Sequence, residues 1–232
     1  MHIPDGYLSP QTYIPLAVVF VAFAAVATKK VKKEVSARNI PYIGMAAAFS
    51  FIIMMFNIPI PGGTTGHAVG SAMVAIILGP WTASIAVSVA LIIQALIFGD
   101  GGITAIGANC FNMAVFMPFT AYYIFTIFCK QHHPIKKIFI VAFISGYISL
   151  VLTAVLTAVE FGIQPYIASS PDGKALYCPY DLSIAIPAML IEHLLLFGVL
   201  EGIITAFIVR YFVKNEPSIV YAFHKGGKNE ID

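Results

Sequence analysis

The sequence has few charged residues, and this scarcity excludes an ordinary soluble domain. Charged side chains make up 10% of the 232 residues, whereas soluble domains carry about 25%. Hydrophobic side chains make up 59%, and the mean hydropathy is +0.88. We therefore predict an all-α integral membrane protein with a single membrane domain over residues 1–232. The small net charge of +2 gives no reason to expect a nucleic-acid partner.

Several motifs are absent, and each absence excludes a class of protein. The three cysteines lie far apart and form no CxxC pair, so we expect neither a zinc site nor a disulfide framework. The chain has no G-x-x-x-x-G-K-[ST] phosphate loop, so any ATP hydrolysis must come from partner subunits. It also lacks the H-E-x-x-H motif of a metalloenzyme and the internal repeats of many secondary transporters. We therefore expect a protein that is not an enzyme.

Long apolar runs predict seven membrane helices, because a helix needs about 20 apolar residues to cross a bilayer. Proline- and glycine-rich or basic stretches separate these runs. The predicted helices cover residues 13–28, 41–56, 67–78, 83–98, 103–128, 138–161 and 182–212. Residues 1–12 form a separate N-terminal segment, which we treat as a candidate metal-binding segment.

The basic residues gather on one side of this predicted topology. If the N-terminus is outside, twelve of the thirteen lysines and arginines lie inside, and only Lys174 lies outside. Cytoplasmic loops carry such an excess, so we predict a multi-pass cell-membrane protein with the N-terminus outside and the C-terminus inside. The twelve residues are Lys29, Lys30, Lys32, Lys33, Arg38, Lys130, Lys136, Lys137, Arg210, Lys214, Lys225 and Lys228.

Met1 and His2 form a candidate metal chelator. The chain start lacks the basic region and cleavage site of a signal peptide, and a bulky second residue generally prevents methionine removal, so we expect a free α-amine. That amine, the backbone nitrogen of His2 and the His2 Nδ1 can surround an ion once the amide proton is displaced. His67, in the glycine-rich loop 61–67, can supply a fourth nitrogen. Four coplanar nitrogens favour Ni²⁺ or Cu²⁺ over tetrahedral Zn²⁺, and Co²⁺ also accepts nitrogen ligands.

Each of these residues also has an ordinary interpretation. A histidine at position 2 can be accidental, and a loop histidine can simply bond a neighbouring group. If His67 began the third helix, the positive end of the helix dipole would face the ion, which is unfavourable. The turn Pro4-Asp5-Gly6 favours the metal site, because it would fold the N-terminus back toward the bundle.

Polar residues inside the predicted helices are candidates for supporting roles. Asn109 and Asn112 either hydrogen-bond the two imidazoles or bond neighbouring helices alone, and Asp5 is a further candidate beside the site. The small residues Gly44 and Ala47, with Ala48, permit close contact with another helix of this chain or with a partner. The sequence assigns no role to three ionisable residues of the last helix, Glu192, His193 and Glu201.

Three stretches together resemble the NikM/CbiM family. They are the opening Met-His-Ile-Pro-Asp-Gly, the loop Pro59-Ile60-Pro61-Gly62-Gly63-Thr64-Thr65-Gly66-His67, and the stretch 107–113. Members of this family are the substrate-binding (S) components of energy-coupling factor importers for nickel and cobalt. The resemblance covers essentially the whole chain.

The resemblance implies a fold, a ligand set and a group of partners. The fold would be the S-component bundle with one extra N-terminal helix, and the Met1 amine, the His2 amide and ring, and His67 would bind the ion. Partners would be a transmembrane coupling (T) subunit, which would contact the patch at Gly44, two ATP-binding-cassette ATPases, and a small accessory membrane protein. The sequence leaves Ni²⁺ against Co²⁺ open, and a metal channel or secondary transporter is a further alternative.

Overall fold

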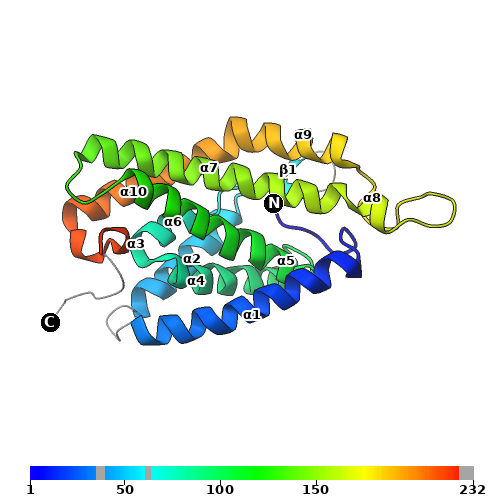
Figure 1. Cartoon of the computed structure of the whole chain (residues 1–232), viewed down its shortest axis with the longest axis horizontal. Coiled ribbons are helices and arrows are strands. Elements are labelled where there is room, and N and C mark those ends of the chain that lie inside the picture. The colour runs from blue at the N-terminus through cyan, green and yellow to red at the C-terminus, as the bar shows by residue number, and fades with distance from the viewer. Residues whose placement is uncertain (35–39, 61–63, 225–232) are drawn as a thin grey trace.

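The computed structural model of the chain describes residues 1–34, 40–60 and 64–224 and consists mostly of helices that lie along one axis (Figure 1). Five helical stretches of these described ranges are long and apolar enough to cross a membrane. They are Pro10–Lys33, Pro80–Phe98, Ile106–Phe128, Ile135–Ile167 and Leu182–Asn215. Six residues used in the predictions lie outside the described ranges: Arg38, Pro61, Gly62, Gly63, Lys225 and Lys228.

Each of the seven predicted segments contains a helix, and two short strands separate the second from the third. The elements in chain order are α1 (Pro10–Glu34), α2 (Ile40–Met54), β1 (Ile58–Ile60), β2 (Thr64–Gly66), α3 (Ser71–Leu78), α4 (Pro80–Ile93), α5 (Ile106–Cys110), α6 (Met117–Phe128), α7 (Ile135–Gly162), α8 (Gln164–Ile167), α9 (Leu182–Glu192) and α10 (Gly198–Asn215). Short 3₁₀ turns follow at Pro217–Ile219 and Tyr221–Phe223.

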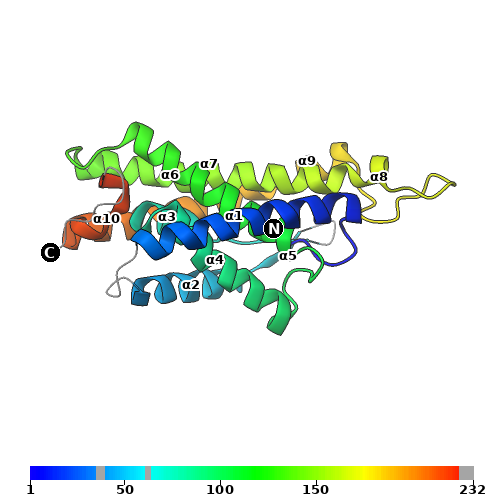
Figure 2. The same cartoon turned by 60° about the horizontal axis from the view of Figure 1, so that its bottom comes forward.

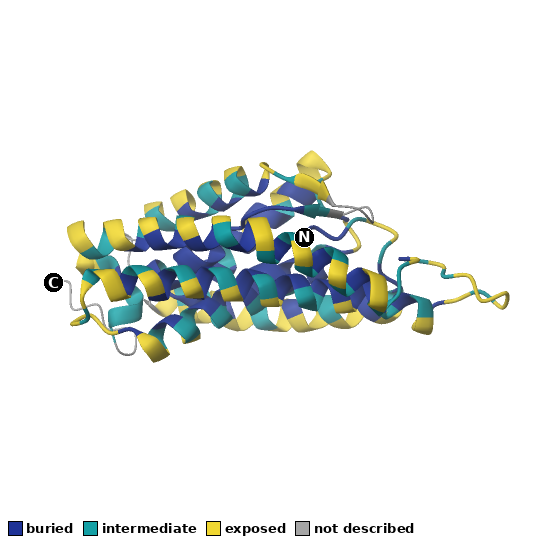
Figure 3. Ribbon diagram, turned by 90° about the horizontal axis from the view of Figure 1, so that it is seen from above, coloured by how far each residue is buried: buried dark blue, intermediate teal, exposed yellow. Residues whose placement is uncertain are grey.

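The outer faces of the helices are exposed and apolar, while buried residues gather along the middle of the bundle (Figure 3). Val21, Ile97 and Leu195 are 64%, 72% and 75% exposed. Soluble monomers rarely expose contiguous apolar surface on this scale, so the surface is that of a protein surrounded by lipid.

The third helix is shorter than the sequence predicted. We expected a helix over 67–78, but α3 begins at Ser71. The strands β1 and β2 pair antiparallel, with Ile58 opposite Gly66, and the chain then runs without helix through 67–70. Gly70 has a φ of 75°, a left-handed conformation that breaks the helix on its N-terminal side. His67 therefore lies on a buried, non-helical segment ahead of α3, and not in the helix.

Three helices contain a π-helical turn. The turns are Gln94–Phe98 after α4, Phe111–Phe116 between α5 and α6, and His193–Phe197 between α9 and α10. A π-turn changes the direction of the side chains that follow it and is frequent at functional sites.

The elements are arranged around α7, which contacts α6, α9 and α10, while α1 passes across one side against α4 and α5 (Figure 2). The short helix α8 and the loop to α9 lie at one end of the long axis. The loop between α6 and α7 and the end of α10 lie at the opposite end (Figure 1). The N-terminus lies between these two ends, because residues 1–9 turn back from α1 into the bundle.

Candidate metal site

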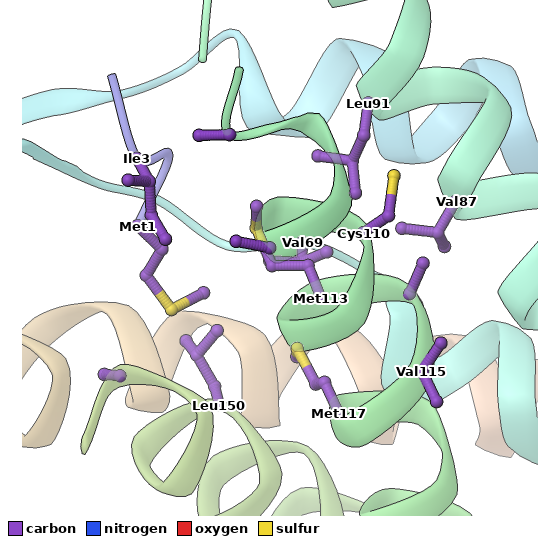
Figure 4. Packing of buried hydrophobic residues seen from close by; sticks show 14 of the residues in the cluster. Met1, Ile3, Val69, Val87, Leu91, Cys110, Met113, Val115, Met117 and Leu150 are labelled. Atoms are coloured by element: carbon purple, nitrogen blue, oxygen red, sulfur yellow. The ribbon is translucent and has the colours of Figure 1, made fainter. Parts of the chain in front are cut away.

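The first residue of the chain is part of the hydrophobic core. The Met1 side chain is 1% exposed, and it points toward Leu150 of α7 in a cluster with Val69 and Met113 (Figure 4). Full burial of a methionine side chain stabilises a protein by about 1.5–3 kcal/mol. Chain termini are usually mobile, so this burial marks the N-terminus as a fixed part of the structure.

The backbone of the N-terminal segment is held at Ile3. The Ile3 N–H donates to Asn109 Oδ1 at 2.8 Å, and Asn109 Nδ2 donates to the Ile3 carbonyl at 3.1 Å. The Gly102 N–H donates to the same carbonyl at 2.8 Å. A Cβ on Gly102 would lie 2.4 Å from the Asp5 nitrogen, so only glycine permits this close approach. The hydrogen bonds of Ile3 therefore fix the backbone directly after His2, and so they fix where His2 lies.

Asp5 anchors the turn that leads out of the core. Its Oδ2 accepts from the Ile103 N–H at 3.0 Å, and its Oδ1 accepts from the Thr104 N–H at 2.9 Å and hydroxyl at 2.5 Å. The hydrogen bond from the Thr104 hydroxyl lowers the pKa of Asp5. Asp5 therefore fixes the segment to the loop ahead of α5 and does not contact an imidazole through these bonds.

The structure brings His2 and His67 together across 64 intervening residues. Their rings stack with centroids 4.5 Å apart and an interplanar angle of 28°, and their exposures are 4% and 0%. The His67 Nδ1 lies 3.1 Å from the carbonyl of Ala68, which favours the tautomer with the proton on Nδ1. The His67 Nε2 is then an acceptor, and it is buried without a hydrogen-bond partner among the residues that the structure describes.

Burial keeps the candidate nitrogen donors neutral. Desolvation lowers the pKa of the Met1 α-amine from 8.0 to about 4. Desolvation, with a smaller contribution from the amine, lowers the pKa of His2 from 6.5 to about 3. Near neutral pH these nitrogens therefore offer lone pairs to a cation without first losing a proton.

Asp100 is a neighbour of the site that the sequence analysis did not single out. Its Oδ1 lies 3.3 Å from His2 Nδ1, and its Oδ2 accepts from Asn57 Nδ2 at 3.3 Å. Burial raises the pKa of this carboxyl group. An acidic residue in the glycine-rich turn Gly99–Gly102 was the available signal, but only the fold places the turn beside His2. A carboxylate here would lower the cost of a buried cation.

Glu201 is a second acidic residue beside the candidate site, and the sequence analysis assigned it no role. It lies on α10 with 0% exposure, and its carboxylate accepts hydrogen bonds from the N–H groups of Val69 and Gly70 at 2.8–3.1 Å. The sequence analysis raised the objection that the positive end of the third helix would face the ion, and this objection is weakened. Helix α3 starts four residues after His67, and a carboxylate already sits at its positive end.

The other candidate residues have different surroundings. Asn112 donates to Thr157 Oγ1 at 3.2 Å and to Glu160 Oε2 at 2.8 Å, which matches the interhelical alternative for this asparagine. His193 is fully buried, and its Nδ1 lies 2.6 Å from the Met189 carbonyl. Its Nε2 has no hydrogen-bond partner in residues 1–34, 40–60 and 64–224.

Side chains alone do not make a metal centre here. Within residues 1–34, 40–60 and 64–224, no group of three or more histidine, cysteine, aspartate or glutamate side chains is placed to hold an ion. A cation bound at the stacked imidazoles would therefore need main-chain donors as well, and the Met1 amine and the His2 amide are the ones at hand.

Comparison with known proteins gives relatives over nearly the whole chain. The family described as the cobalt uptake substrate-specific transmembrane region, CbiM, matches residues 2–219. The chain is 44% identical over 223 residues to the probable fused nickel transport protein LarMN of Lactiplantibacillus plantarum, covering 95% of this chain and 67% of that protein. It is 46% identical over 221 residues to the fused nickel transport protein NikMN of Rhodobacter capsulatus, covering 95% of this chain and 64% of that protein.

The same similarity holds for a solved structure. A crystal structure described as a truncated transition metal transporter superposes with a TM-score of 0.88 and 46% identity, covering 92% of this chain and 99% of that chain. The chain spans about two thirds of the length of the two fused relatives.

Proposed function

The chain belongs to the CbiM/NikM family of nickel and cobalt transport proteins, and from this premise we propose that it is the substrate-binding component of an energy-coupling factor importer. In this proposal it captures Ni²⁺ on the outer side of a cell membrane. The observation that carries the proposal is the contact of the His2 and His67 rings inside the core, directly beside the buried Met1.

The proposed site holds the ion in a plane of four nitrogens. The Met1 amine, the deprotonated His2 amide and the His2 Nδ1 supply three donors, and His67 Nε2 supplies the fourth. The His67 Nε2 supports this assignment. It has no partner within the described part of the chain, and a buried acceptor without a partner costs about 1–3 kcal/mol that a ligand would recover. The amide anion and the nearby Asp100 carboxylate would together offset the charge of a divalent ion.

Nickel is the first choice of substrate, and cobalt is the alternative. A planar set of nitrogen donors favours Ni²⁺, and the names of both fused relatives refer to nickel. The matching family is described by cobalt uptake, which supports Co²⁺ as the second candidate. An absorption spectrum separates the two, because square-planar Ni²⁺ gives a yellow, diamagnetic complex.

We further propose a seven-helix S-component bundle with one extra N-terminal helix, N-terminus outside and C-terminus inside. In this topology residues 1–12 are the metal-binding segment. Residues 58–60 and 64–78 would cross as two paired strands, a non-helical segment and the short helix α3, which a membrane tolerates where the irregular backbone is buried in protein. The basic residues support the orientation, because the end of α1, the α6–α7 loop and the end of α10 lie at one end of the bundle (Figure 1).

The proposed partners are a T subunit, two ATP-binding-cassette ATPases and a small accessory membrane protein. Contact with the T subunit is assigned to Gly44, Ala47 and Ala48 of α2. Their exposure supports this, since Gly44 and Ala48 are exposed and a Cβ on Gly44 would meet nothing within 4 Å. Metal-stimulated ATP hydrolysis after reconstitution with these partners would distinguish an energy-coupled importer from a channel or secondary transporter.

The test is a calorimetric titration of the purified chain with Ni²⁺. One residue added before Met1, or His67→Ala, should abolish tight binding, because the first removes the amine from the chelate and the second removes the fourth donor. His132→Ala is the matched control, since His132 is an exposed histidine of the α6–α7 loop, and it should bind like wild type. Unchanged affinity in the extended protein would refute the proposed site.

A further inference from the structure

Glu201 is a fully buried acidic residue in the mostly apolar first half of α10. It lies on α10 between Leu200 and Gly202, and its exposure is 0%. A carboxylate buried in a membrane helix is costly unless both oxygens are bound by donors. Residues of this kind therefore call for a specific explanation, and the sequence alone offers none.

Both oxygens of Glu201 are bound by the segment that carries His67. The Val69 N–H donates to Oε2 at 2.8 Å. The Gly70 N–H donates to Oε1 at 3.1 Å and to Oε2 at 2.9 Å. These three hydrogen bonds satisfy both carboxyl oxygens, and they fix the backbone two and three residues after His67.

A second residue of the same helix face holds the other end of the segment. A Cβ on Gly66 would lie 1.9 Å from the ring of Phe197, so the Gly66 backbone lies directly on that ring. Phe197 and Glu201 are four residues apart and so share one helix face. The segment 66–70 is thus held at both ends by one turn of one helix, with the His67 imidazole between the two contacts.

We propose that Glu201 is a positioning residue that sets the His67 Nε2 for the transported ion and ties this ligand to α10. The inference rests on the proposed metal site. Glu201 does not touch the ion in this scheme and acts through the backbone of residues 67–70. The role needs a carboxylate, because a glutamine would turn an N–H₂ donor toward the two backbone donors.

A double-mutant cycle tests whether Glu201 acts through His67. The four proteins are wild type, E201Q, H67A and the double variant, each purified at full length with its native N-terminus. Cu²⁺ serves as the probe, because the three nitrogens of Met1 and His2 should still bind it when His67 is absent. We expect E201Q to weaken Cu²⁺ binding about 10–100-fold in the wild-type background. In the H67A background the same substitution should change the affinity by less than about twofold.

Glu160→Gln is the matched structural control. Glu160 is a second buried carboxylate, on α7, and its Oε2 accepts from Asn112 and not from the His67 segment. Both glutamine variants should lower the thermal midpoint, but only E201Q should lower the affinity. Should E201Q fail to fold, E201D takes its place in the cycle, because its side chain keeps the charge but is one methylene short of the two amides.

The outcomes separate this inference from the proposed function. Equal losses of affinity for E201Q in both backgrounds, or no loss in the wild-type background, would overturn the positioning role while leaving the metal site intact. If H67A itself binds Ni²⁺ and Cu²⁺ like wild type, the proposed site fails first. A loss confined to the His67-containing background supports the inference.

Discussion

Acid should release the N-terminal segment from the core of the metal-free protein. Burial lowers the pKa of the Met1 amine from 8.0 to about 4 and the pKa of His2 from 6.5 to about 3. When residues 1–9 leave the core, both groups regain their ordinary pKa values and take up protons. The opened state then binds more protons than the closed state, so acid favours opening. The stabilisation is fully present above about pH 8 and declines as the pH falls toward 4 and then 3.

The magnitude follows from these two shifts. Between pH 7 and pH 5 the amine contributes a loss of about 2–3 kcal/mol and His2 a loss of about 2 kcal/mol. Together they weaken closure of the segment by about 4–5 kcal/mol, which is about a thousandfold in the opening equilibrium.

Hydrogen exchange at Ile3 is the direct assay, because its N–H is bonded to Asn109 inside the core. After correction for the intrinsic exchange rate, protection of Ile3 should fall about a thousandfold between pH 7 and pH 5. His2→Ala should reduce that fall to about a hundredfold, since only the amine then titrates. A buried stretch of α7 serves as the internal control and should keep its protection. Protection of Ile3 that stays constant over this range would refute the reasoning.

Two further substitutions test how the segment is held. Gly102→Ala places a Cβ 2.4 Å from the Asp5 nitrogen, so we expect it to displace the segment and to weaken Ni²⁺ binding by about tenfold or more in calorimetry. Asn109→Ala removes both hydrogen bonds to Ile3 and should cost about 1–3 kcal/mol of segment closure. Its Ile3 protection should be lower at every pH, with the same pH slope as wild type; a changed slope would contradict the electrostatic explanation.

The helices could be predicted from sequence because their signal is local. Each apolar run is bounded by lysines, prolines or glycines, and the structure has a helix in each. The hairpin was not predicted, since three-residue strands are too short to show alternation, and β1 includes Pro59, which is normally confined to sheet edges. The start of α3 at Ser71 depends on contacts between residues distant in sequence: Gly66 lies on the Phe197 ring, and Glu201 binds the residues just before the helix.

The candidate site was predictable only in part. Met1, His2 and His67 were predicted as ligands because nitrogen donors in those positions have a recognisable chemistry. The structure brings the two imidazoles into contact, and their role as ligands stays a prediction. The support around them was not found in the same way. Asp100 and Glu201 are single acidic residues whose partners are backbone groups or an imidazole far away in the sequence, and no pattern of side chains reveals such pairings.

A binding group carried at the end of a chain has a simpler exit than one carried on a loop. A loop can leave a protein core only if the chain on both of its sides moves with it, so two lengths of backbone must pass between the surrounding helices. The Met1 amine is connected to the bundle in one direction only, through residues 1–9 and then α1, and most side chains of α1 face outward. If Met1 is a ligand, as proposed, release of the ion would need only this single strand to leave the core, while the helices stay in contact.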